Sequence, residues 1–126
     1  VQTCALPISD GSPPPANSAP WFDYADAGCF WDHGYQDYVW YFDVDANDDV
    51  GPRSVVAVWA DVYDDATGEL ADSFDLAAEP GKSWYSAWIG STTYLDPSYG
   101  LYAVDLSAQD ENGAIGVQTV YPFPCE

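Results

Sequence analysis

Basic residues are almost absent from this sequence, in which Lys and Arg together number two against 21 Asp and Glu, for a formal net charge of -19. Nucleic acids and anionic membrane surfaces are bound through clusters of positive charge, so this balance excludes both as partners. Cations, neutral sugars and basic proteins remain as ligands. The scarcity of lysine also suits a saline environment, where salt screens repulsion between carboxylates.

The chain also lacks an apolar run of about 18 residues, so we expect no transmembrane helix and no insertion into a membrane. It has one histidine, His33, and, apart from Cys4, two cysteines that are expected to be bonded to each other, which leaves too few ligands for a zinc site. Asp and Glu are so plentiful that no spacing singles out a pair of glycosidase carboxylates. No Ser or Cys is placed by the sequence beside His33 as a nucleophile. The sequence therefore predicts a non-catalytic protein without a cofactor.

Residues 1–8 read VQTCALPI, which resembles the translation of a DNA-sequencing adapter, GTT CAG ACG TGT GCT CTT CCG ATC. We interpret them as an artefact of a metagenomic read and exclude them from the fold. On this interpretation the natural start of the protein is missing and Cys4 is not native. A lipid-modified Cys4 is the alternative, but Val1–Thr3 is a poor lipobox.

Residues 9–20 read SDGSPPPANSAP and are rich in Pro and Ser. Such a composition buries no apolar surface and predicts an extended tether with polyproline character. Tethers of this kind separate modules in extracellular chains.

The remaining residues, 21–126, form the predicted domain. Its organising stretch is 54–63, SVVAVWADVY, which is mostly apolar on both alternating faces and predicts a central strand covered from two directions. Other strands are expected over 21–26, 35–45, 69–76, 83–91, 99–109 and 114–123. The segments 64–68 and 110–113 predict tight hairpin turns. About seven short strands without an amphipathic helix predict an all-β fold, an antiparallel β-sandwich.

A pattern near the C-terminus resembles the last two strands of immunoglobulin-like modules of the fibronectin type III and PKD kind. It comprises Tyr102, Val104, Leu106, Ala108, Asp110 and Gly113, preceded by Leu95 and Pro97. Alternate apolar residues would face the core, and the Asp and Gly would shape the hairpin. The Trp-Asp-Phe-Gly-Asp motif of PKD domains is absent. The resemblance implies an immunoglobulin-like sandwich of about seven strands.

Two cysteines, Cys29 and Cys125, remain once Cys4 is set aside. If successive strands alternate in direction, Cys29 before the second strand and Cys125 after the last fall at the same pole. We therefore expect a disulfide between them, with two buried free thiols as the alternative. A disulfide requires an oxidising compartment, so we expect the protein to be extracellular or at the cell surface.

The same topology places loops 47–51 and 110–113 together at the opposite pole, where their oxygen ligands could bind Ca²⁺. The candidate ligands are Asp45, Asn47, Asp48, Asp49, Asp110 and Glu111. FDVDANDDVG resembles the opening of a calcium loop through Asp43, Asp45 and Asn47. Asp48 stands where that loop needs Gly, and Ser54 where it needs Glu. Solvated carboxylates in the loops of an acidic protein are the alternative.

Six Trp and ten Tyr exceed what a core of about 100 residues needs. Trp84 and Trp88 share a face of one expected strand, and Trp21, Trp31 and Tyr35 lie near the start of the domain. Rows of such rings can stack on sugars, whereas the alternative is that they fill the core in place of Met and Leu.

We therefore expect a structural, spacer or adhesion module of a larger secreted or surface protein of bacteria. Its partner would be an unidentified protein or a polysaccharide. The alternatives are a carbohydrate-binding module with exposed aromatics and a calcium-stabilised stalk module.

Overall fold

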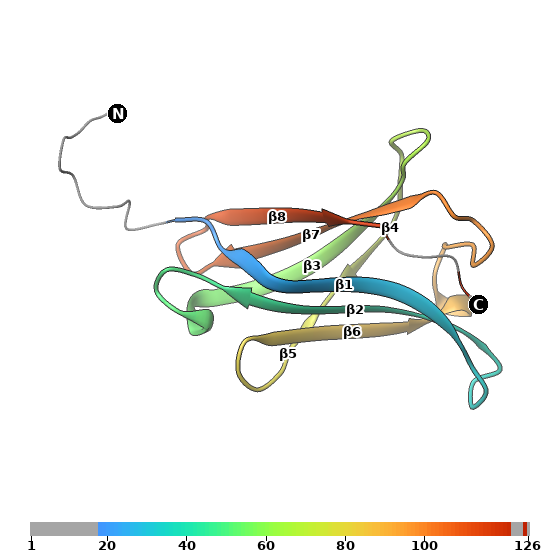
Figure 1. Ribbon diagram of the computed structural model, residues 1–126, viewed down its shortest axis with the longest axis horizontal. Coiled ribbons are helices and arrows are strands. Elements are labelled where there is room, and N and C mark those ends of the chain that lie inside the picture. Colours follow the sequence, from blue (N-terminus) through green and yellow to red (C-terminus); the bar gives the residue numbers. More distant parts are fainter. Residues whose placement is uncertain (1–17, 122–124, 126) are drawn as a thin grey trace.

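A computed structural model describes residues 18–121 and 125, which form two antiparallel sheets packed face to face (Figure 1). The first sheet has the strand order β1-β2-β6-β5, and the second has β4-β3-β7-β8. The strands are β1 (Trp21–Asp32), β2 (Asp37–Asn47), β3 (Val55–Asp64), β4 (Leu70–Asp75), β5 (Ala77–Ala78), β6 (Ser83–Ile89), β7 (Tyr102–Asp110) and β8 (Ile115–Val120). The predicted all-β antiparallel sandwich is thus confirmed, and the two-residue β5 raises the strand number to eight.

Several sequence-based predictions concern residues outside this described part. They are the adapter-like residues 1–8, the tether up to residue 17, and the end of the strand expected over 114–123. Within residues 18–121, the only helical elements are short 3-10 turns, Pro52–Ser54 and Gly90–Thr92. In the same part of the chain, no helix has the length and apolar character needed to cross a membrane.

The core lies between the sheets and is built from alternate residues of the long strands. On β2, Trp40, Phe42 and Val44 are at most 2% exposed, while the residues between them are half-buried. Burying each such side chain stabilises the fold by about 1.5–3 kcal/mol. The other inward-facing residues come mainly from β3 and β7: Val58, Ala60, Val62, Val104, Leu106 and Ala108. The period of two read from the sequence therefore reports the inner faces of two stacked sheets.

The expectation that both faces of residues 54–63 would be covered is wrong. A bulge between Val55 and Ala57 leaves Val56 54% exposed. Beyond the bulge, Val58, Ala60 and Val62 face the core, and Trp59 on the opposite face is only half-buried. A two-layer sandwich covers each strand on one side only, so β3 is central within its sheet, between β4 and β7, rather than between layers.

The first strand is longer than expected. β1 runs to Asp32 rather than to Asp26, so Cys29 lies inside β1 and not in a connection before the second strand. A register shift between Phe22 and Tyr24 leaves Asp23 as an extra residue in β1. Bulges of this kind bend a strand and re-aim its side chains.

The two expected hairpin turns are present. Gly68 and Gly113 have φ of 77° and 93°, a backbone conformation that glycine adopts without steric cost. The Asp64 and Asp110 carboxylates accept hydrogen bonds from backbone N–H groups of their own turns. At the start of β7, the Tyr102 hydroxyl accepts a 2.9 Å hydrogen bond from the backbone N–H of Asp96. This bond ties the 93–101 loop to the buried strand that follows it.

Candidate functional site

The cysteine pair lies at one pole of the sandwich. The Cα atoms of Cys29 and Cys125 are 4.7 Å apart, and their sulfur atoms lie within disulfide bonding distance. Both side chains pack against the core, and Cys29 stands directly opposite the buried Trp40 on β2. The backbone N–H of Cys125 donates to the carbonyl of Pro97, which holds this part of the chain against the 93–101 loop. The described C-terminal cysteine is therefore positioned by backbone as well as by sulfur.

The acidic loops meet at the opposite pole, as the sequence predicts. The backbone N–H of Glu111 donates to the carbonyl of Ser54 over 2.9 Å, which joins the two loops. Asp48 and Asp110 are only 4% and 2% exposed. The Asp48 carboxylate accepts from the Ser54 hydroxyl and from its neighbour's backbone N–H, and Asp110 accepts from two backbone N–H groups. Both carboxylates therefore stabilise the turns.

The candidate calcium ligands do not form one cluster. Asp43 and Asp45 lie on β2, within the strand that was expected over 35–45, and Asn47 is the last residue of β2. Across the described residues, no group of three or more His, Cys, Asp or Glu is placed to hold a metal ion. The resemblance to a calcium loop thus fails at the level of local structure, since extended backbone directs alternate residues to opposite faces.

His33 lies exposed in the turn between β1 and β2. The Asp32 carboxylate beside it accepts hydrogen bonds from the backbone N–H groups of Gly34 and Tyr35. This is the bonding of a turn-capping Asp. Among the described hydrogen bonds, none joins His33 to a carboxylate or to a hydroxyl.

An open cavity of about 320 Å³ is lined by Asp64, Glu69, Leu70, Ala71, Asp96, Tyr99 and Tyr102. The Tyr99 hydroxyl donates a 2.7 Å hydrogen bond to Asp64 and lowers the pKa of that carboxyl. The backbone N–H of Ser98 lowers the pKa of Asp96. Both carboxyls are therefore held in the charged form, whereas a glycosidase acid needs its pKa raised. The cavity holds negative charge, which suits binding better than proton donation.

The tryptophans named from the sequence do not form one exposed strip. Trp84 and Trp88 stand opposite Val44 and Trp40 on the inner face of the first sheet, and the Trp88 ring lies 5.3 Å from that of Phe74. Trp31 packs edge-on against Tyr38 near the β1–β2 turn, with ring centroids 5.1 Å apart. Of this set, Trp84 packs against the core. Trp21, Trp31 and Trp88 are 42%, 41% and 37% exposed, so the core-filling interpretation describes only part of the set.

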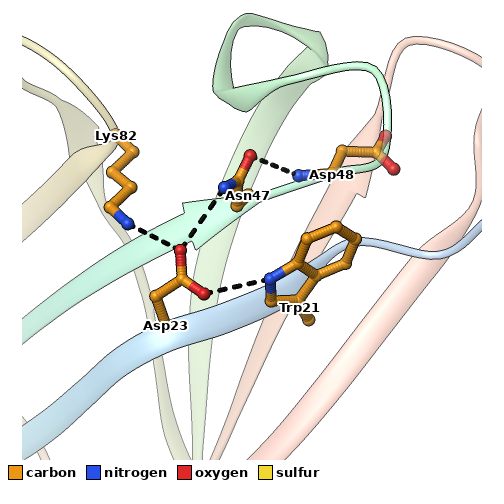
Figure 2. Close-up of polar contacts among 5 residues, drawn as sticks. All are labelled: Trp21, Asp23, Asn47, Asp48 and Lys82. Carbon is orange, nitrogen blue, oxygen red and sulfur yellow. Dashed lines mark hydrogen bonds and ion pairs between the residues drawn. The ribbon is translucent and has the colours of Figure 1, made fainter.

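Trp21 belongs to a polar network at the bulge of β1, which Figure 2 shows. Asp23 accepts hydrogen bonds from the Trp21 indole, from Asn47 and from Lys82, the only lysine of the chain. The Lys82 Nζ lies 2.6 Å from Asp23 and is the main reason that the pKa of Asp23 is lowered. The network joins β1, the end of β2 and the turn before β6.

An aromatic and acidic surface that the sequence analysis missed covers the outer face of the first sheet. Strand register arranges it in cross-strand rows: Asp26–Asp43–Tyr85, Tyr24–Asp45–Ser83 and Gly28–Tyr41–Ala87. We call these nine residues the β1–β2–β6 face. Tyr24 and Tyr85 are 49% and 37% exposed. The alternation of Tyr41, Asp43 and Asp45 along β2 was visible in the sequence, but the pairing that brings Tyr24 and Tyr85 beside them was not.

Glycine shapes this face at one position. A Cβ added at Gly28 would lie 2.7 Å from the Tyr41 hydroxyl oxygen and 2.8 Å from its ring. The Tyr41 ring therefore lies across β1 in the space that a side chain would fill. Its hydroxyl reaches Asp26 and donates a 3.2 Å hydrogen bond to that carboxylate. A Gly opposite an aromatic residue thus fixes the orientation of the ring on the sheet.

The carboxylates of the β1–β2–β6 face disturb the titration of their neighbours. Burial raises the pKa of Asp43, and the charges of Asp45, Glu79 and Asp26 raise it further. The charge of Asp26 is the largest of the causes that raise the pKa of Tyr24. Burial, followed by Asp26, raises the pKa of Tyr41. These shifts have one sign because burial and the neighbouring negative charges both disfavour the ionised form of each group.

Comparison of the chain with models of known protein families, with curated proteins and with solved structures found no match.

Proposed function

We propose that this chain is a non-catalytic, immunoglobulin-like module of a larger secreted or surface protein, with a spacer or adhesion role. The observation that carries the proposal is the Cys29–Cys125 pair, which ties β1 to the chain beyond β8. The Pro- and Ser-rich composition of residues 9–20 supports it, because such a tether separates modules.

The strand order supports the immunoglobulin-like assignment. Immunoglobulin constant-type domains pair strands A, B, E and D in one sheet and C, F and G in the other. The order β1-β2-β6-β5 reproduces the first of these, and β4-β3-β7-β8 reproduces the second with one strand added beside β3. The hydrogen bond from the Asp96 backbone to the Tyr102 hydroxyl has the form of the tyrosine corner of that fold. The cysteine pair departs from the usual B–F position.

A spacer module in a tethered chain is pulled through its two ends. If the disulfide is formed, a pulling force applied before Trp21 is transmitted along β1 to Cys29 and through the disulfide to Cys125. The 96-residue loop between the two cysteines is then outside the path of the force. In a disulfide-closed module, the core of the sandwich stays folded under tension that would otherwise unravel it strand by strand.

Single-molecule pulling on a tandem array of the chain tests this proposal. With the disulfide closed, only residues 21–28 can extend, by at most roughly 28 Å, because an extended chain spans about 3.5 Å per residue. After reduction, residues 21–125 can extend, by roughly 370 Å. A Cys29→Ser/Cys125→Ser array is the control and should give the long extension in both conditions. Long unfolding steps from the oxidised array would contradict the proposed spacer role.

A further inference from the structure

The two sheets each carry a pair of like charges directly opposite one another on their outer faces. On the second sheet the pair is Asp61 on β3 and Asp105 on β7. On the first sheet it is Asp26 on β1 and Asp43 on β2. Like charges at this position destabilise a sheet unless something compensates them. The two pairs differ in how their repulsion is compensated, and this difference indicates what the first sheet binds.

The pair on the second sheet is compensated within the fold. The Ser73 hydroxyl on β4 donates a 2.7 Å hydrogen bond to Asp61, and the Thr119 hydroxyl on β8 donates a 2.6 Å hydrogen bond to Asp105. Both hydroxyls stand in the same cross-strand row as the carboxylates they contact. Each carboxylate of this row therefore accepts a hydrogen bond from the hydroxyl at its own end of the row.

In the described part of the chain, the pair on the first sheet accepts no hydrogen bond from a side chain of its own row. Asp26 accepts a 3.2 Å hydrogen bond from Tyr41, and a hydrogen bond with Asp26 is among the causes that raise the pKa of Tyr24. No described hydrogen bond from another side chain reaches Asp43. Asp45 follows on the same face of β2, and Glu79 adds its charge from the turn before β6. The carboxylates of this face therefore repel one another with little internal compensation.

The two basic residues of the chain do not neutralise this crowding. Lys82 lies at the edge of the β1–β2–β6 face, where Asp23 is its partner and Asp45 a more distant charge. Arg53 is exposed in the turn before β3, at the start of the other sheet. His33 lies in the β1–β2 turn. Within the rows of the face, every ionisable side chain is an Asp or a Tyr.

We propose that the β1–β2–β6 face binds a basic polypeptide segment, with an arginine side chain seated over the Asp26–Asp43 row. Charge complementarity identifies the occupant: a guanidinium supplies the donors and the positive charge that this row lacks. Tyr85 stands beside Asp43 in this row, and Tyr24 lies in the neighbouring row. Both offer partly exposed rings on which the flat guanidinium can stack. A neutral sugar could also stack on these rings, but it would leave the carboxylate repulsion in place.

This inference rests on the adhesion role proposed above and names the class of partner for it. It does not depend on the path of tension, because binding is measured on the chain in free solution. A failure of the binding experiment therefore leaves the pulling experiment to decide the spacer role separately.

Calorimetric titration of the chain with a capped hexa-arginine peptide in 0.15 M salt tests the proposal. Asp26→Asn/Asp43→Asn should weaken binding about tenfold, since charged pairs at interfaces are worth about 1.5 kcal/mol or more. Asp61→Asn/Asp105→Asn is the matched control: it removes the same charge from the other sheet and should leave binding within about twofold. Equal weakening by both variants would mean that the peptide responds to overall charge, which would overturn the proposal.

A second pair of variants separates stacking from charge. Tyr24→Ser/Tyr85→Ser should weaken binding of hexa-arginine more than that of hexa-lysine, because a planar guanidinium stacks on aromatic rings better than an ammonium does. Tyr94→Ser, at an 86% exposed position in a loop, should change neither. Thermal melting of each variant checks that it is folded. Binding of cellohexaose that is lost in Tyr24→Ser/Tyr85→Ser, with no effect on hexa-arginine, would identify a sugar platform and refute the basic partner.

Discussion

Reduction of the Cys29–Cys125 disulfide should remove a large part of the stability of this domain. The cross-link closes a loop with a sequence separation of 96 residues. In the chain-entropy model, a loop of that length stabilises the folded state by about 4.7 kcal/mol at 25 °C, through the conformations it removes from the unfolded chain. Domains are stable by about 5–15 kcal/mol in total, so the reduced protein should lie close to its unfolding threshold.

Guanidinium unfolding followed by tryptophan fluorescence measures this effect, with the oxidised protein compared with the same protein in a phosphine reductant. Cys4→Ser is introduced in both samples so that no other thiol exchanges. Cys29→Ser/Cys125→Ser serves as the control and should be insensitive to the reductant. The reasoning is refuted if reduction lowers the free energy of unfolding by less than about 1 kcal/mol, since the loop term would then be absent.

Three further substitutions test separate parts of the structure. Asp43→Asn should stabilise the protein at neutral pH, because the folded state raises the pKa of Asp43 and so disfavours its charged form. This gain in stability should disappear below pH 3.8, the ordinary pKa of the group, where the carboxyl is neutral in both the folded and the unfolded state. A gain in stability that persists at low pH would contradict this cause. Gly116→Ala should destabilise the fold by about 1–3 kcal/mol in urea unfolding, because its Cβ would overlap the Pro20 carbonyl oxygen; wild-type stability would show that Pro20 does not pack on β8. Tyr102→Phe should lower the free energy of unfolding by about 1–3 kcal/mol, because it leaves the Asp96 backbone N–H without its acceptor. An unchanged melting temperature would show that this hydrogen bond does not stabilise the fold.

The sandwich could be predicted from the sequence because side-chain alternation is a local property. Tyr102, Val104, Leu106 and Ala108 were expected on one side of a strand, and all four are at most 7% exposed in β7. The hairpin turns were predictable for the same reason, since Gly113 supplies a conformation that its own turn requires.

Strand ends and bulges were less predictable because they depend on the partner strand. Cys29 lies inside β1, which extends as far as its pairing with β2 allows, and Val56 is exposed by a register shift against β7. The possible calcium loop is not formed, because Asp43 and Asp45 lie in the strand that was expected over 35–45. Pairing with β1 extends that strand to Asn47, which the sequence did not predict.

The β1–β2–β6 face was hidden from the sequence for a different reason. Tyr24, Asp43 and Tyr85 lie far apart along the chain, and only the register of three strands places them together. Alternation along one strand correctly predicted that Trp84 and Trp88 share a face. It could not show that this is the inner face of the sheet, because that depends on how the two sheets pack.

Peptide mapping of the oxidised protein without reduction shows whether Cys29 and Cys125 are joined. Cleavage before aspartate separates residues 26–31, which contain Cys29, from residues that contain Cys4, and releases Cys125 in a C-terminal peptide. We expect a single linked species in which the 26–31 peptide is joined through sulfur to the Cys125 peptide, since the 4.7 Å separation of the Cα atoms lies within the range of disulfides. Recovery of both peptides alkylated as free thiols from an oxidising medium, or of a Cys4 link to either, would contradict it.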